Sequence, residues 1–147
     1  PTEYLIPLTK IELLLRSGDE VRCRSELDAA RRLNAPAEHL LVAQAKIEQL
    51  VGLKEAQEGN LREAEERFSQ AASLDMAWAA PDINRGAVLE KLGDADGAYA
   101  CYLKALEIEA ENPVALYNLS LLLFGRDEIV RASTYIRRLM VSEAAYP

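Results

Sequence analysis

The sequence predicts an all-α fold made of stacked helical hairpins, with eight helices. Three observations predict it. The 147 residues include only 7 Gly and 6 Pro, so long regular elements with short connections are expected. The composition is 50% hydrophobic but only 6% aromatic, with abundant Ala, Leu and Glu, which favours helices over sheets. Apolar residues also recur with a constant period along the chain, and the length of this period is typical of a two-helix repeat.

The 34-residue period is visible at six sets of positions. A small residue recurs at Ala64, Ala98 and Ala132, and a large residue recurs at Phe68, Tyr102 and Ile136. The other sets are Ala71, Ala105 and Leu139; Gly52, Gly86 and Ser120; Gly59 and Gly93; and Leu61, Ala95 and Ile129. Positions 61, 64, 68 and 71 lie three and four apart, as on one face of a helix. We therefore expect the small residues to let two helices approach and the large residues to occupy the space beside them.

The first three helices are expected at 7–17, 19–33 and 36–58. The third is long because Cys23 and Ala64, which occupy the same small position, are separated by seven residues more than the repeat period. Seven extra residues are close to two helical turns, so they add about 10 Å to one helix and keep its apolar face in phase. On this extension we expect Leu40 and Leu41 to pack against Tyr4, Leu5 and Ile6.

The other five helices are expected at 61–74, 79–92, 95–109, 113–125 and 128–142. Gly59 and Gly93 supply the positive-φ residue that ends a helix, and Pro81 is expected near the start of its helix. The last helix has an apolar side that no following helix covers, whereas a terminal repeat normally has a polar outer face. We expect either that the natural protein continues or that something docks there.

These residues resemble the tetratricopeptide repeat, a 34-residue helix-turn-helix unit. NPVALYNLSLLL (112–123) is similar to its first helix, GDADGAYACYLKALEIEAENP (93–113) to its turn and second helix, and GDEVRCRSELDAARRLNAP (18–36) to a weaker copy of that second part. The resemblance implies a right-handed superhelical solenoid in one domain, 1–147, with repeats at about 5–35, 36–76, 77–110 and 111–144. The large apolar position early in the first helix holds Leu116 in the last repeat but Glu48 and Asp82 in the middle repeats.

The resemblance also implies a binding groove, because the first helices line a concave surface in that family. The groove positions are Lys46, Gln49, Leu53 and Ala56; Ala80, Ile83, Ala87 and Glu90; and Val114, Tyr117, Leu121 and Phe124. The last set is wholly apolar, and the other side of the same helix already packs in its own hairpin. This predicts a partner contact there, with burial by the chain itself as the alternative. Acidic tails are not expected ligands, because Ile83 and Tyr117 stand where a carboxylate clamp favours cations.

The sequence predicts no catalytic, cofactor-binding or metal-binding site. The one histidine, His39, lacks metal-ligand spacing and is interpreted as a partly exposed residue near a helix start. Neither a GxGxxG nor a GxxxxGK[ST] phosphate loop occurs. Glu63, Glu65 and Glu66 are interpreted as a solvated charged face rather than a catalytic pair. An enzyme is therefore not expected.

Charge and hydropathy reduce the classes of partner that the chain is expected to bind. With 24 acidic and 17 basic residues the net charge is -7, which disfavours nucleic acid. No stretch approaches the ~20 apolar residues of a membrane helix, so membrane insertion is not expected. Cys23 and Cys101 do not make a disulfide framework, and we expect both to remain thiols in a cytoplasmic, reducing compartment.

The leading hypothesis is a non-enzymatic protein-interaction scaffold whose groove binds a protein or peptide segment with apolar anchors. A narrower form of it is a secretion or pilus-assembly chaperone. The alternative is a self-assembling structural repeat unit, or a fragment of a longer repeat protein, that forms homo-oligomers through the last repeat.

Overall fold

The computed structural model describes residues 2–144, the last three of them by their backbone alone. Over these residues the chain forms eight helices and no strand: α1 (Leu5–Ser17), α2 (Glu20–Arg32), α3 (Ala37–Glu58), α4 (Leu61–Leu74), α5 (Ala80–Lys91), α6 (Ala95–Ile108), α7 (Pro113–Gly125) and α8 (Ile129–Ala144). The all-α class and the order of the helices are confirmed. The largest differences are that α1 begins at Leu5 rather than 7 and that α8 ends at Ala144 rather than 142.

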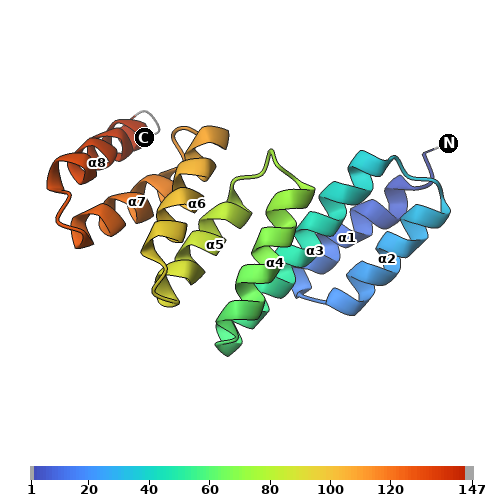
Figure 1. Ribbon diagram of the computed structural model, residues 1–147. Coiled ribbons are helices and arrows are strands. Elements are labelled where there is room, and N and C mark those ends of the chain that lie inside the picture. The colour runs from blue at the N-terminus through green and yellow to red at the C-terminus, as the bar shows by residue number, and fades with distance from the viewer. Residues whose placement is uncertain (1, 145–147) are drawn as a thin grey trace. The chain divides into compact units, whose positions relative to one another are not determined.

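The helices pair in sequence as antiparallel hairpins, α1 with α2, α3 with α4, α5 with α6 and α7 with α8 (Figure 1). The hairpins belong to two compact units, α1–α4 and α5–α8, divided between Met76 and Ala77. In the first unit α3 also contacts α1 and α2, and in the second α7 contacts α5 and α6. The division coincides with the expected boundary between the second and third repeats. That all four repeats form one domain stays a prediction.

Each hairpin turns at a residue in the left-handed region of φ and ψ. These residues are Gly18, Gly59, Gly93 and Asp127, with φ of 70°, 88°, 84° and 62°. Gly adopts this conformation without a steric penalty, and Asp tolerates it better than most residues. The step from Gly18 to Gly59 equals the step from Cys23 to Ala64, and the two later steps equal the repeat period. The turn residues of the backbone therefore follow the same spacing that the apolar side chains predicted.

A glycine meets an aromatic ring in each of the two middle hairpins. A Cβ atom on Gly52 would lie 2.7 Å from Cε1 of Phe68, and one on Gly86 would lie 2.6 Å from Cε1 of Tyr102. Both rings are fully buried. The expectation that small residues admit close helix approach beside a large one is therefore confirmed for these hairpins.

The last hairpin departs from this arrangement. Ile136 was expected to occupy the position of Phe68 and Tyr102, but its side chain is 43% exposed. Ser120 stands in the glycine position, and its own Cβ takes part of the space that a ring occupies in the other hairpins. Tyr135 and Leu139 of α8 pack against the core instead.

The long third helix is confirmed: α3 has 22 residues, and the seven additional residues are helical rather than a loop. Their expected packing is only partly correct. Leu40 packs against a buried cluster that includes Ile11 and Cys23, whereas Leu41 and Ile6 are exposed. The aromatic ring of Tyr4 approaches the ring of His39 instead, at a centroid distance of 5.8 Å.

The two acidic residues in the apolar position of the middle repeats are buried and paired. Glu48 accepts hydrogen bonds from Nη1 of Arg24 on α2 at 3.3 Å and from Nη1 of Arg67 on α4 at 2.9 Å. Asp82 lies 2.9 Å from Nζ of Lys104 on α6. Buried charges are stable only when paired, so these ion pairs explain how carboxylates fit an apolar position.

Candidate functional site

Helix α7 presents apolar side chains on two opposite sides. Its first turn is fixed by Asn112, whose Oδ1 accepts hydrogen bonds from the backbone N–H groups of Val114 and Ala115, and by Pro113 at the first helical position. From there the helix contains few polar side chains. A helix that is apolar all round needs cover on every side.

One side of α7 is committed to the core of its own unit. Ala115, Leu116, Leu119, Leu122 and Leu123 are buried in a cluster with side chains of α6 and α8. These residues hold α7 in place, so the direction of its other side is fixed by packing and not by a loop.

The other side of α7 is exposed. It consists of Val114, Tyr117, Leu121 and Phe124, here called the α7 stripe, each between 51% and 62% exposed. The spacing of three, four and three places these side chains along one line, about 15 Å long at 1.5 Å per residue. An exposed apolar row of this length, with two aromatic members, is typical of a contact surface.

The predicted groove positions on α3 and α5 do not form a continuous exposed apolar row like the α7 stripe. Gln49 and Ile83 are buried, so their side chains are not accessible as the helices lie. Lys46 forms an ion pair with Glu12 of α1, and Leu53 is exposed. Ala87 is half-buried.

Glu90, another predicted groove position, has a structural contact. Its Oε1 accepts the hydroxyl hydrogen of Tyr102 at 2.5 Å. Burial of the ring and the neighbouring Glu90 carboxylate raise the pKa of Tyr102 far above its ordinary range, while a hydrogen bond with Asn118 acts in the opposite direction. This phenol therefore stays protonated and anchors the α5–α6 hairpin.

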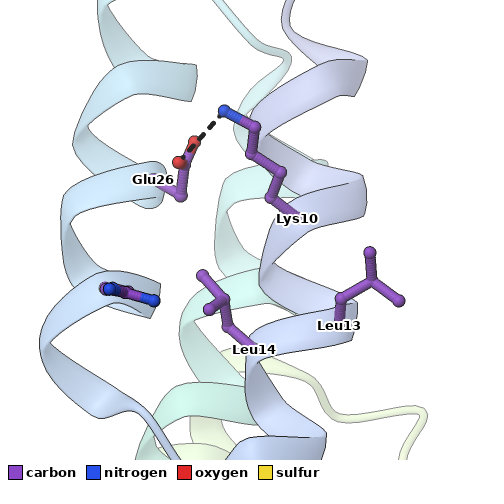
Figure 2. Close-up of a pocket in the computed structure, with 5 residues that line it drawn as sticks. Lys10, Leu13, Leu14 and Glu26 are labelled. Atoms are coloured by element: carbon purple, nitrogen blue, oxygen red, sulfur yellow. Dashed lines mark hydrogen bonds and ion pairs between the residues drawn. The ribbon is translucent and has the colours of Figure 1, made fainter.

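A surface pocket that the sequence analysis did not predict lies between α1 and α2. It has a volume of about 350 Å³ and is lined by Lys10, Leu13, Leu14, Arg22 and Glu26. Figure 2 shows Leu14 turned toward α2 and Lys10 joined to Glu26, with Nζ to Oε1 at 3.2 Å. The signal in the sequence was weak, because Lys10 interrupts the apolar face of α1.

The described residues include no group of three or more His, Cys, Asp or Glu side chains placed to hold a metal ion. His39 is partly exposed and lies beside Tyr4. Cys23 and Cys101 are both buried thiols, as expected. Among the helices described, none combines the length and the apolar character that crossing a membrane requires.

Comparison with curated proteins finds a local sequence match. The curated TPR repeat-containing protein MJ1428 of Methanocaldococcus jannaschii is 32% identical over 56 residues, which make up 38% of this chain and 10% of that relative. The chain thus matches only about a tenth of the length of this relative. No family model matches the chain.

Solved structures agree on the fold. Two crystal structures of MamA superimpose with TM-scores of 0.69 and 0.66 at 14% and 16% identity, covering 94% and 95% of this chain and 87% and 84% of theirs. A third MamA structure, MSR-1 C2, has a TM-score of 0.65 at 13% identity and full coverage of both chains. The chain has the helical-hairpin repeat fold of these structures, and its local sequence match is to a TPR repeat-containing protein, so both support the resemblance to the tetratricopeptide repeat. In the terms of that repeat, α1, α3, α5 and α7 correspond to first helices, and α2, α4, α6 and α8 correspond to second helices.

Proposed function

We propose that this tetratricopeptide-repeat chain is a non-enzymatic scaffold that binds a protein segment along the α7 stripe. The observation that carries the proposal is the exposure of Tyr117, Leu121 and Phe124 on a helix whose opposite side is buried. The fold is that of a protein-interaction repeat, and rigid helical surfaces of this kind bind without the entropic cost of ordering a loop.

The stripe favours a particular kind of segment. Apolar anchors spaced three or four residues apart on a partner helix, or on alternate residues of an extended strand, match a row about 15 Å long. The nearby cation Arg126 is already paired with Asp96 at 2.7 Å and lies over the ring of Tyr99. We therefore propose a partner segment that binds through apolar side chains and not through an acidic tail. The thiol state of both cysteines supports the further proposal of a reducing, cytoplasmic location.

The test uses selection of peptides from a displayed random library on the immobilised wild-type chain. Selected peptides should share apolar anchors, and their affinity for Tyr117→Ala and Phe124→Ala should fall by about 2 kcal/mol or more, because aromatic anchors dominate such contacts. The matched control is Val130→Ala, which removes an even more exposed apolar side chain, from α8. Peptides that bind the Tyr117→Ala and Phe124→Ala variants as tightly as the wild type would contradict the proposal.

A further inference from the structure

The pocket between α1 and α2 belongs to a wider exposed surface. Ile6 and Leu13, both on α1, are each 62% exposed. A second pocket, lined among others by Ile6, Lys10, Glu26 and Leu33, shares Lys10 and Glu26 with the pocket of Figure 2. We call Ile6, Lys10, Leu13 and Leu14 the α1 seat.

The repeat register shows what this surface corresponds to in the last hairpin. Gly18 and Asp127 are the left-handed residues between the helices of their hairpins, and Cys23 and Ala132 are the buried small residues of the second helices. Gly18 and Cys23 are as far apart in the sequence as Asp127 and Ala132, so the first and last hairpins can be aligned residue by residue. With this offset, Ile6, Lys10, Leu13 and Leu14 correspond to Ala115, Leu119, Leu122 and Leu123.

Those four residues of α7 are buried in a cluster to which α5, α6 and α8 contribute, and the preceding second helix, α6, is one of the helices that contact α7. Helix α6 contacts α7, and its side chains Tyr102 and Leu106 belong to the same cluster as Leu119 and Leu122. The α1 seat is therefore the counterpart of a surface that is buried in the last hairpin, with α6 as one neighbour. Here Ile6, Lys10 and Leu13 are exposed, whereas Leu14 is half-buried against the core of its own unit.

Helix α8 carries the complementary surface. One repeat period after Ala95, Tyr102 and Leu106 of α6 lie Ile129, Ile136 and Met140, here called the α8 stripe. In α6, Leu106 is buried in a cluster that includes side chains of α7, whereas Tyr102 is buried against Gly86 of α5 and also reaches Asn118 of α7. In α8 the three corresponding side chains are all exposed, Met140 by 66%.

We propose that α8 of one copy docks on α1 of a second copy, so that the α8 stripe covers the α1 seat in the way that α6 covers α7. One chain carries both surfaces, in the register that already joins α6 to α7, and this names a second copy as the occupant. Such a contact is head-to-tail, because the two copies use different surfaces. It goes beyond the proposed function, since no residue of the α7 stripe takes part.

The junction is less apolar than its internal counterpart. Lys10 replaces Leu119 in the α1 seat, and Arg137 beside the α8 stripe replaces Leu103. Two cations near a small apolar contact weaken association, so we expect a dissociation constant of roughly 10–100 μM.

The experiment is sedimentation velocity of the purified 147-residue chain over a range of concentrations up to about tenfold above that dissociation constant. Leu13→Glu disrupts only the α1 seat and Met140→Glu only the α8 stripe. Each variant alone should remain monomeric, with association weakened at least tenfold. Their mixture should form a 1:1 pair and stop there, because one variant keeps the stripe and the other keeps the seat.

The matched controls are Val21→Glu and Val130→Glu, which are exposed and correspond to each other in the register. They also correspond to Asp96, which is highly exposed, and both variants should associate as the wild type does. Circular dichroism checks the folding of each variant. If Leu13→Glu or Met140→Glu fails to fold, Leu13→Gln or Met140→Gln replaces it.

Three results would overturn the proposal. The first is a wild-type chain that stays monomeric throughout the concentration range. The second is self-association of Leu13→Glu alone, which would indicate contact between two α8 helices. The third is the absence of a 1:1 pair in the mixture. Tyr117→Ala should leave self-association unchanged, so failure of this proposal and failure of the α7 stripe proposal are distinguishable.

Discussion

In Gly86→Ala, a steric clash with the ring of Tyr102 opposes the gain from the higher helix propensity of Ala. The new Cβ would lie 2.6 Å from Cε1 and 2.9 Å from both Cδ1 and Cζ of the ring. Carbon atoms in contact normally lie about 3.5–4.0 Å apart, so the ring or the helix has to move by about 1 Å. The ring is fully buried and its hydroxyl is bonded to Glu90, so it has little room to move.

The expected magnitude follows from two terms. Overpacking a dense core typically costs about 1–3 kcal/mol, and the upper part of that range applies to a fixed ring. Replacing Gly by Ala within a helix stabilises the folded state by about 1 kcal/mol. Gly86→Ala should therefore lower the free energy of unfolding by about 1–2 kcal/mol, although Ala is the better helix former.

Urea unfolding followed by circular dichroism measures this free energy. The matched control is Gly125→Ala on α7, where a Cβ meets no atom within 4 Å, so the change should be neutral or slightly stabilising. In a Tyr102→Leu background the ring is gone, and Gly86→Ala should become stabilising by up to about 1 kcal/mol. If Gly86→Ala stabilises the otherwise wild-type chain, or costs the same in both backgrounds, close helix approach is not what requires this glycine.

Three further predictions concern other parts of the chain. Glu48→Ala leaves the guanidinium groups of Arg24 and Arg67 without their buried partner, so urea unfolding should show a loss of about 1–3 kcal/mol; a neutral result would contradict the importance of the pair. Burial, with Asp19 and Glu20 nearby, raises the pKa of the Cys23 thiol above its ordinary value of 9.0, so alkylation at pH 8 should be slower in the folded than in the urea-unfolded chain. Equal alkylation rates in the folded and unfolded chain would refute the raised pKa. The same shift means that this thiol's contribution to the free energy of unfolding is complete below pH 9 and is lost as the pH rises through the folded-state pKa. On α7, Tyr117→Ala should change the thermal stability of the free chain little, whereas Leu119→Ala should cost about 2–5 kcal/mol, and equal losses would mean that the stripe is core.

The helices could be predicted from the sequence because the signals that set them are local or periodic. Gly59 and Gly93 end their helices by backbone conformation alone, which is visible in the residue type. The length of α3 followed from the long step between Cys23 and Ala64, because seven additional residues preserve the phase of a helix. The α7 stripe was predictable for the same reason, since its exposure depends on which side of one helix is already occupied.

What the sequence did not reveal depends on residues that lie off the period. Glu48 is stabilised by Arg24 and Arg67, which lie 24 and 19 residues away and share no repeat position. The burial of Gln49 and Ile83 could not be read from their register either. A register fixes the side of a helix on which a residue lies, whereas burial depends on what packs against that side.

The last hairpin shows how one change in the core alters the surface. A Cβ and an aromatic ring share the seam only if one of them shifts, as the 2.6 Å approach at Gly86 indicates, so Ser120 in the glycine position disfavours a buried ring in the position of Tyr102. That position holds Ile136, whose shorter side chain lies partly at the surface. Together with Ile129 and Met140 it gives α8 an apolar outer side. The departure from the repeat pattern inside the hairpin is therefore linked to the surface that we assign to contact with a second copy.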